Sequence, residues 1–170
     1  MAKQVGSTGT VIGADFAPAQ LANAAVKMTD IYPPLTQIEW LEADALNLPF
    51  ADEYFDAATM GYGLRNVTDI PLCLRELHRV LKTNTKVAIL DFHRPEGKFI
   101  RRFQQWYLDN IVVPQATKLG MMAEYAYLNP SLDRFPTGTE QVALGLAAGF
   151  SHATHYPIAG GMMGILVLTK

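Results

Sequence analysis

Cysteine is almost absent from this sequence, and its scarcity excludes two classes of protein. Cys73 is the single cysteine among 170 residues, so neither a disulfide framework within the chain nor a cysteine-rich zinc site can form. The four histidines are scattered without carboxylates at ligand spacing, and we therefore expect no metal site.

Charge is also sparse. Charged residues make up 18% of the chain, whereas an average globular domain carries about 25%. The 14 Lys and Arg residues are outnumbered by 16 Asp and Glu residues, which gives a net charge of −2. A nucleic-acid partner would require a clustered basic face, so we expect none.

Long apolar runs are missing as well. No stretch reaches the roughly 18 consecutive apolar residues of a membrane span, and the first nine residues lack the apolar core of a signal peptide. We therefore expect the cytoplasm, or the cytoplasmic face of a membrane, as the location. Apolar residues make up 49% of the chain, and its length fits one domain, residues 1–170, with a buried core.

Strand and helix patterns alternate along the chain. Short apolar runs predict strands, helical spacing of apolar residues predicts helices, and two adjacent glycines predict a closing hairpin. The predicted strands are 10–15, 37–43, 54–61, 86–92, 152–158 and 164–169, and the predicted helices are 18–30, 68–83, 97–119 and 137–150. This order predicts an α/β fold, with a mostly parallel sheet that ends in an antiparallel hairpin.

Three features follow strand ends, where open α/β sheets place their ligands. Asp15 could accept hydrogen bonds from a ribose diol, or it could only cap the next helix. Asp44 followed by Ala45 could receive an adenine ring, or it could form a simple turn. Gly61 permits close backbone approach to a ligand, and Arg65 lies just beyond it with Asp69 as the local carboxylate that could neutralise it.

Several motifs carry a resemblance to a known family. They are Leu48-Pro-Phe-Ala-Asp-Glu-Tyr-Phe-Asp56, Gly63-Leu-Arg-Asn-Val67 and Glu76-Leu-His-Arg-Val-Leu-Lys82. The chain resembles a class I S-adenosylmethionine-dependent methyltransferase of the ubiquinone/menaquinone C-methyltransferase family. Three later segments are similar to the phylloquinone branch of that family in oxygenic phototrophs: Leu90-Asp-Phe-His-Arg-Pro95, Trp106-Tyr-Leu-Asp-Asn-Ile-Val-Val-Pro114 and Gly160-Gly-Met-Met-Gly164.

The resemblance implies a Rossmann-like fold, S-adenosylmethionine as cofactor, and methylation of a ring carbon of a reduced prenylated naphthoquinone. It implies Arg65 as the catalytic residue. Because a guanidinium stays protonated, we expect Arg65 to stabilise a phenolate rather than to act as a base. The implied cofactor-binding residues are Asp15, Phe16, Asp44, Ala45, Gly61 and Tyr62, and the implied substrate-binding residues are Asn66, His93, Phe103 and Tyr107.

The sequence departs from the family at its start. Family members have a first strand and a glycine-rich cofactor loop that find no match here, so we expect the central strand of the sheet to be absent. Two alternatives stay open: a menaquinone, ubiquinone or other small-molecule methyltransferase, and an inactive fragment that lacks the cofactor loop.

An apolar stripe at helical spacing over residues 99–122 admits two interpretations. It could pack in the core, or it could form a lid over the quinone that also meets a bilayer, with Lys98, Arg101 and Arg102 towards the headgroups. The second interpretation predicts transient contact with a membrane surface and a location peripheral to the thylakoid membrane. Homo-oligomer formation is left open.

Overall fold

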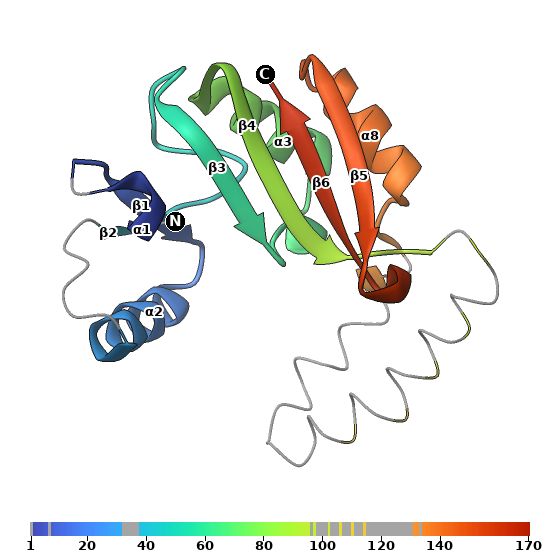
Figure 1. The fold of residues 1–170 in the computed structure, drawn as a ribbon, viewed down its shortest axis with the longest axis horizontal. Coiled ribbons are helices and arrows are strands. Elements are labelled where there is room, and N and C mark those ends of the chain that lie inside the picture. The colour runs from blue at the N-terminus through green and yellow to red at the C-terminus, as the bar shows by residue number, and fades with distance from the viewer. Residues whose placement is uncertain are drawn as a thin grey trace. The chain divides into compact units, whose positions relative to one another are not determined.

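The computed structural model describes residues 2–6, 8–31, 38–95, 97, 102, 106, 110, 114, 131, 132 and 134–170. The chain divides into two compact units, Met1–Pro49 and Phe50–Lys170, and Figure 1 shows the elements of each. The expectation of one domain over residues 1–170 stays a prediction.

The first unit holds a two-stranded parallel sheet. Its elements are α1 (Ala2–Val5), β1 (Val11–Asp15), α2 (Pro18–Ile31) and β2 (Ile38–Glu42). The pairing of β1 with β2 runs from Val11 opposite Ile38 to Asp15 opposite Glu42, and the amide of Ala43 donates to the Asp15 carbonyl at 3.1 Å. Both strands therefore end at the same edge.

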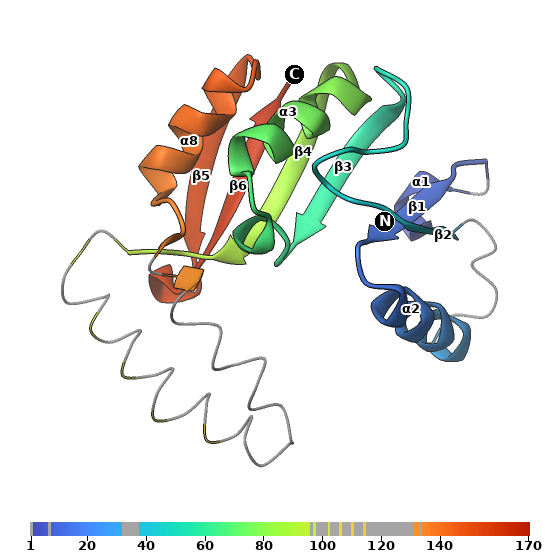
Figure 2. The same cartoon turned by 180° about the vertical axis from the view of Figure 1, so that it is seen from behind.

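The second unit is a four-stranded sheet with helices on one face. Its elements are β3 (Phe55–Gly61), the 3₁₀ turn η1 (Leu64–Asn66), α3 (Ile70–Val80), β4 (Leu81–Phe92), α8 (Gly138–Ala147), β5 (His152–Ile158), η3 (Ala159–Gly161) and β6 (Met163–Thr169). The strand order is β3-β4-β6-β5. β3 and β4 are parallel, whereas β6 runs antiparallel to both β4 and β5. Figure 2 shows α3 and α8 side by side on one face.

The core of the second unit lies between this sheet and the two helices. Alternate residues of β4 and β6 point into it, because successive side chains of a strand face opposite sides. Burying each leucine or isoleucine fully is worth about 1.5–3 kcal/mol. The fully or nearly fully buried side chains include Leu74, Val87, Ile89, Leu166 and Leu168. This packing fixes the carboxyl end of β4, where the site begins.

The observed sheet agrees with the predictions from the sequence in three respects. The fold is α/β, β3 runs parallel to β4, and the closing hairpin is antiparallel about Gly160 and Gly161, whose positive φ angles of 67° and 87° suit glycine. Within the described residues β1 pairs only with β2, and β3 pairs only with β4. The expected absence of the central strand stays a prediction. The described pairings are half parallel and half antiparallel.

The helix predicted over 68–83 is shorter in the structure. Asp69 caps it, because its Oδ1 accepts from the Leu72 amide at 2.8 Å. The helix ends at Val80, since Leu81 takes an extended conformation, is fully buried, and pairs with Phe55. β4 has an irregularity between Leu81 and Lys86, where Asn84 has a φ of 63°. Most of the helix predicted over 97–119 lies outside the described residues.

Candidate functional site

Arg65 lies on η1, directly after β3 and its two glycines. The neighbouring Leu64 is fully buried and anchors the turn against the core. The Arg65 side chain is only 8% exposed, although arginine is usually a surface residue. A buried guanidinium needs partners for its charge and for its N–H groups.

The principal partner of Arg65 is Asp91, near the carboxyl end of β4. Asp91 Oδ2 accepts from the Arg65 amide at 3.0 Å, and Oδ1 accepts from Arg65 Nε at 3.3 Å. Nη1 donates to Ser131 Oγ, and the guanidinium carbon lies 5.5 Å from the centre of the Phe92 ring. The expectation that Asp69 is the carboxylate available to Arg65 is wrong, because Asp69 caps α3 instead.

A cavity of about 600 Å³ opens beside Arg65. This volume lies within the range of small-molecule sites, which combine apolar walls with a few polar groups. Arg65, Asn66 and Arg134 are polar groups on its wall, and Ile70, Phe135 and Leu144 are apolar ones. Such a cavity can receive a flat apolar ring that carries hydroxyl groups.

The segment between β3 and Arg65 is held by its own contacts. The Tyr62 amide donates to the Leu90 carbonyl at 2.8 Å, and Asn66 Nδ2 donates to the Tyr62 carbonyl at 3.0 Å. Tyr62 has a φ of 56°, and its ring lies 5.7 Å from that of Phe92. At Gly61 an added Cβ would meet nothing within 4 Å. Space for a ligand therefore exists along this segment.

The acidic cofactor candidates lie in the first unit. Asp15 and Asp44 are both exposed, Asp15 at the carboxyl end of β1 and Asp44 two residues beyond that of β2. Each uses Oδ1 for a backbone amide two residues on, at 2.9 Å from Ala17 N and from Leu46 N respectively. Each carboxylate thus closes a local turn and remains an exposed acceptor. This pair of acceptors fits the hydroxyl donors of a ribose diol and the N–H donors of an adenine amino group.

The remaining cofactor candidates differ in exposure. Phe16 is 73% exposed and Ala45 is half-buried in the turn after β2. Because Gly61 and Tyr62 belong to the second unit, a cleft shared by all six residues stays a prediction.

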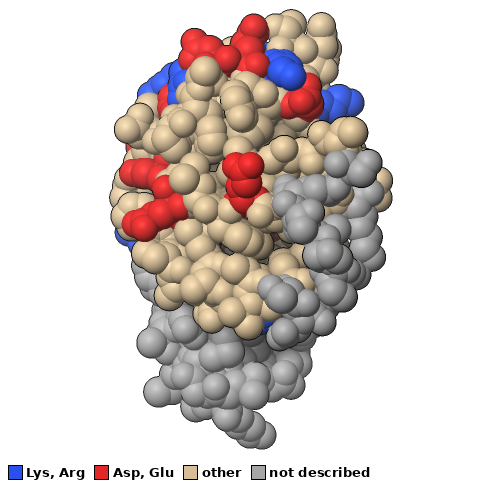
Figure 3. Space-filling model, turned by 90° about the vertical axis from the view of Figure 1, so that its left-hand side faces the viewer, with Lys and Arg blue, Asp and Glu red and all other residues tan. Residues whose placement is uncertain are grey.

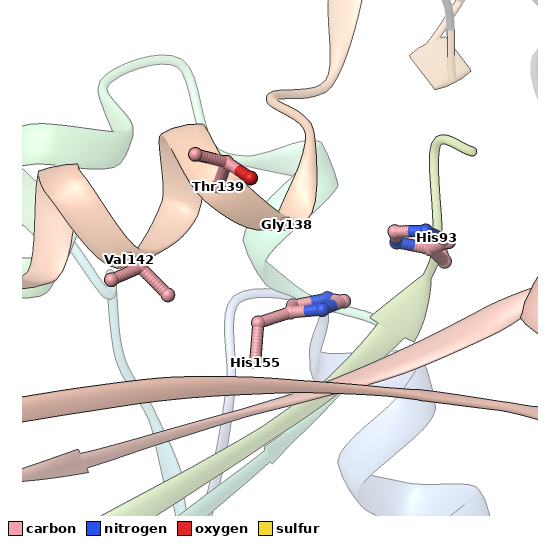
Figure 4. Close-up of a pocket in the computed structure, with 5 residues that line it drawn as sticks. All are labelled: His93, Gly138, Thr139, Val142 and His155. Atoms are coloured by element: carbon pink, nitrogen blue, oxygen red, sulfur yellow. The ribbon is translucent and has the colours of Figure 1, made fainter. Parts of the chain in front are cut away.

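His93 and His155 come together in a second cavity, of about 290 Å³. Figure 4 shows the two imidazoles facing each other from the end of β4 and from β5, with ring centres 4.9 Å apart. A side chain at Gly138 or Gly164 would clash with the ring of His155, so the two glycines make room for it. Burial lowers the pKa of His155 below its ordinary value of 6.5, and the neighbouring His93 lowers it further.

The structure therefore separates the predicted acceptor residues. Arg65 and Asn66 line the larger cavity, and His93 lines the smaller one. The ring of His155 packs against that of His93. Phe103 and Tyr107 lie outside the described residues. Among the residues that are described, no group of three or more His, Cys, Asp or Glu side chains could hold a metal ion.

Comparison with known proteins decides the family. The family model described as the ubiE/COQ5 methyltransferase family matches residues 1–170. The chain belongs to the ubiE/COQ5 methyltransferase family. This membership confirms the predicted family, and with it an S-adenosylmethionine-dependent methyltransferase.

Similar members of the ubiE/COQ5 family come from cyanobacteria and a plant. A Nostoc sp. protein named 2-phytyl-1,4-naphtoquinone methyltransferase is 61% identical over 170 residues, which is all of this chain and 74% of that protein. The chloroplastic 2-phytyl-1,4-beta-naphthoquinone methyltransferase of Arabidopsis thaliana is 48% identical over 171 residues, covering 100% of this chain and 66% of that protein.

Solved structures agree on the fold. A SAM-dependent methyltransferase from Aquifex aeolicus superposes with a TM-score of 0.68 at 18% identity, over 98% of this chain and 72% of that one. A SAM-dependent methyltransferase from Thermotoga maritima superposes with a TM-score of 0.61 at 20% identity, over 94% of this chain and 72% of that one. The likeness confirms the predicted class I methyltransferase fold.

Proposed function

We propose that this ubiE/COQ5 family member transfers a methyl group from S-adenosylmethionine to a ring carbon of a reduced prenylated naphthoquinone, in phylloquinone biosynthesis. The observation that carries the proposal is the cavity of about 600 Å³ beside Arg65, which joins a buried guanidinium to apolar walls. The names of the relatives from Nostoc sp. and Arabidopsis thaliana support 2-phytyl-1,4-naphthoquinol as the acceptor.

The acceptor must be the quinol because an oxidised quinone ring carbon is a poor nucleophile. Loss of a proton from one hydroxyl gives a phenolate, which pushes electron density onto the ring carbon that is methylated. S-adenosylmethionine, when bound, supplies an electrophilic methyl group on a sulfonium. The ring carbon forms its bond to the methyl group as the carbon–sulfur bond breaks, and the electron pair of that bond stays on sulfur, which leaves as the neutral thioether. The methylated ring carbon then loses its proton to water, and the ring regains its aromaticity.

Arg65 has the place and the charge to act on the phenolate oxygen. Nη1 donates to Ser131 and Nε donates to Asp91, while Nη2 donates to no residue in the described part of the chain. A fixed cation of this kind stabilises developing negative charge without reorganising during the reaction. Asp15 and Asp44 would hold the nucleoside through their outward carboxylate oxygens, and the walls of the cavity would hold the ring in reacting orientation.

A direct assay tests the proposal. We would incubate the protein with methyl-labelled S-adenosylmethionine and either 2-phytyl-1,4-naphthoquinol or its oxidised quinone. We expect label on the quinol ring carbon and none on the oxidised quinone, because the latter lacks the phenolate. Labelling of the oxidised quinone without a reductant would contradict the quinol chemistry.

Two further measurements separate the alternatives. A benzoquinol with a prenyl tail, used in the same assay, would take the label preferentially if the acceptor were of the ubiquinone type. Calorimetric titration with S-adenosylmethionine would show no binding if the chain were an inactive fragment.

We propose further that the protein works at the surface of the thylakoid membrane, from which a phytyl-tailed quinol must be drawn. In the part of the chain that the structure describes, no helix is long and apolar enough to span a bilayer. Among the described residues visible in Figure 3, Asp and Glu are at least as prominent as Lys and Arg. Residues with so few basic side chains offer little to the phosphates of a nucleic acid.

A flotation experiment tests the membrane proposal. We expect a fraction of the protein to float with vesicles of thylakoid lipids that contain the phytyl quinone. Protein that stays entirely in the dense fractions, with and without the quinone, would contradict membrane contact.

A further inference from the structure

We propose that Asp91 is a positioning residue for methyl transfer: it fixes the direction of the Arg65 guanidinium and sets the charge that the acceptor meets. The proposal rests on the proposed function of the Arg65 cavity. It deepens that function by assigning the regulation of acceptor ionisation to one buried carboxylate.

The first argument is the burial of Asp91. The residue is 3% exposed and lies opposite Gly164 of β6, inside the sheet. Transfer of an isolated carboxylate from water to such a place is costly unless it is paired and hydrogen-bonded. A carboxylate in this position therefore needs a specific partner, and Arg65 is that partner.

The second argument is the way in which the two carboxylate oxygens are used. Oδ2 holds the backbone of η1 through the Arg65 amide. Oδ1 accepts from Arg65 Nε and from the Phe92 amide, the latter at 2.8 Å. One side chain thus fixes both the backbone and the side chain of Arg65 to the end of β4, so the guanidinium has little freedom to turn.

The third argument is the edge of the guanidinium that Asp91 occupies. A carboxylate that paired with both terminal nitrogens would consume the fork that recognises oxygen ligands. Asp91 takes Nε instead, and Ser131 takes Nη1, so that among the residues that the structure describes none uses Nη2, which can then meet an acceptor oxygen. The Phe92 ring lies against the guanidinium at 5.5 Å and limits its tilt.

The fourth argument concerns charge. Arg65 and Asp91 together form a neutral pair, so a quinol entering the cavity meets an oriented donor rather than an isolated cation. Removal of the carboxylate charge would leave an uncompensated cation that favours the ionised acceptor. The same removal would release the guanidinium from its orientation. Acceptor ionisation and turnover are therefore expected to move in opposite directions.

The test uses 1-naphthol, a stable phenol with one hydroxyl on the same ring system, and needs no cofactor. The ionisation of bound 1-naphthol is followed by absorbance in the wild-type protein and in the variant Asp91→Asn. We expect the pKa of the bound naphthol to fall by about one unit in Asp91→Asn. In the methyl-transfer assay we expect kcat to fall roughly tenfold to a hundredfold, because the guanidinium is misplaced, with KM for S-adenosylmethionine unchanged.

Three further variants make the result specific. Asp56→Asn removes the same charge from the exposed partner of Lys82 at the start of β3, and it should leave the naphthol ionisation at the wild-type value. Asp91→Glu keeps the charge, so it should also leave the ionisation unchanged while it lowers kcat; it serves as the second variant if Asp91→Asn fails to fold. The double variant Arg65→Lys/Asp91→Asn should lose less kcat than the product of the fold-losses of the two single variants, because the two residues act as a pair.

Each outcome supports or overturns the positioning role of Asp91. A fall in the pKa of bound naphthol together with a fall in kcat supports the proposal, since a purely structural role would lower kcat and thermal stability without easing ionisation. Wild-type ionisation in Asp91→Asn, or an equal shift in Asp56→Asn, would overturn it. Failure of the wild-type protein to bind 1-naphthol at all would overturn the acceptor site itself, and with it the proposed function.

Discussion

At the scale of single residues, Arg65 combines burial with an Nη2 group that no described residue accepts from. We expect Arg65→Ala to lower the rate of methyl transfer about 10²–10³-fold, which corresponds to about 2.7–4 kcal/mol for one lost electrostatic contact. Arg65→Lys should recover only part of this rate, because lysine keeps the charge but loses the planar fork. Single-turnover rates and calorimetry of S-adenosylmethionine check that rate changes while cofactor affinity does not.

The thermal stability of these variants must be measured beside the rate. Arg65→Ala leaves Asp91 buried without its cation, and breaking such a pair typically costs about 3–5 kcal/mol. Full turnover of Arg65→Ala with unchanged acceptor affinity would show that the catalytic role of Arg65 is wrong.

Asp15 offers a second prediction at the same scale. Asp15→Ala should weaken binding of S-adenosylmethionine by about 1.5–3 kcal/mol, the range for a hydrogen bond to a charged group. Asp15→Asn is the matched control, because its side-chain oxygen can still accept from the Ala17 amide and so keeps the local cap. If Asp15→Asn and Asp15→Ala bind the cofactor as tightly as the wild type, Asp15 serves only as a cap.

At the scale of elements, α8 depends on a capping box at its start. Thr137 Oγ1 accepts from the Glu140 amide, and Glu140 Oε2 accepts from the Thr137 amide at 2.7 Å. Thr137→Ala should lower the free energy of unfolding by about 1 kcal/mol in urea denaturation. Thr139 is exposed and lies two residues after Thr137 in the same helix, so Thr139→Ala should change the free energy of unfolding by less than about 0.5 kcal/mol. Equal losses of stability in the two variants would contradict the role of Thr137 as a cap.

The contact between β5 and the end of β4 predicts how stability depends on pH. The pKa of His155 is lowered, so the folded protein prefers its neutral form, whereas the unfolded chain takes up a proton near the ordinary value of 6.5. The contribution of neutral His155 to the free energy of unfolding is complete above pH 6.5 and is lost as the pH falls through the folded-state pKa. The pKa of His78 is lowered as well, mainly by burial and then by Lys170, so both histidines contribute.

Denaturation midpoints between pH 7.5 and 5 measure this dependence. We expect His155→Gln to reduce it, because glutamine does not titrate, while His152→Gln on the exposed side of β5 leaves it unchanged. If the denaturation midpoint of His155→Gln depends on pH as steeply as that of the wild type, the pair of His93 and His155 does not cause the pH dependence of stability.

At the scale of the whole molecule, the sequence predicted the elements better than the contacts between them. Local periodicity and capping residues located most strands and α8, because these signals lie within one element. The pairing of Arg65 with Asp91 joins residues 26 positions apart, and that of His93 with His155 joins residues from two strands. A carboxylate in the buried strand 86–92 was the available signal for Asp91, but only the parallel register of β3 and β4 shows that it meets Arg65.

The position of β6 in the sheet has a consequence for how the chain is made. β6 comes after β4 and β5 in the chain, yet it lies between them and pairs with both. On a ribosome, the inner edge of β4 therefore emerges long before its partner and stays open until β6 follows. Such unpaired strand edges invite association with other chains. Slow translation of the segment between β4 and β6 should accordingly favour aggregation, whereas a chaperone that covers strand edges should raise the yield of folded protein.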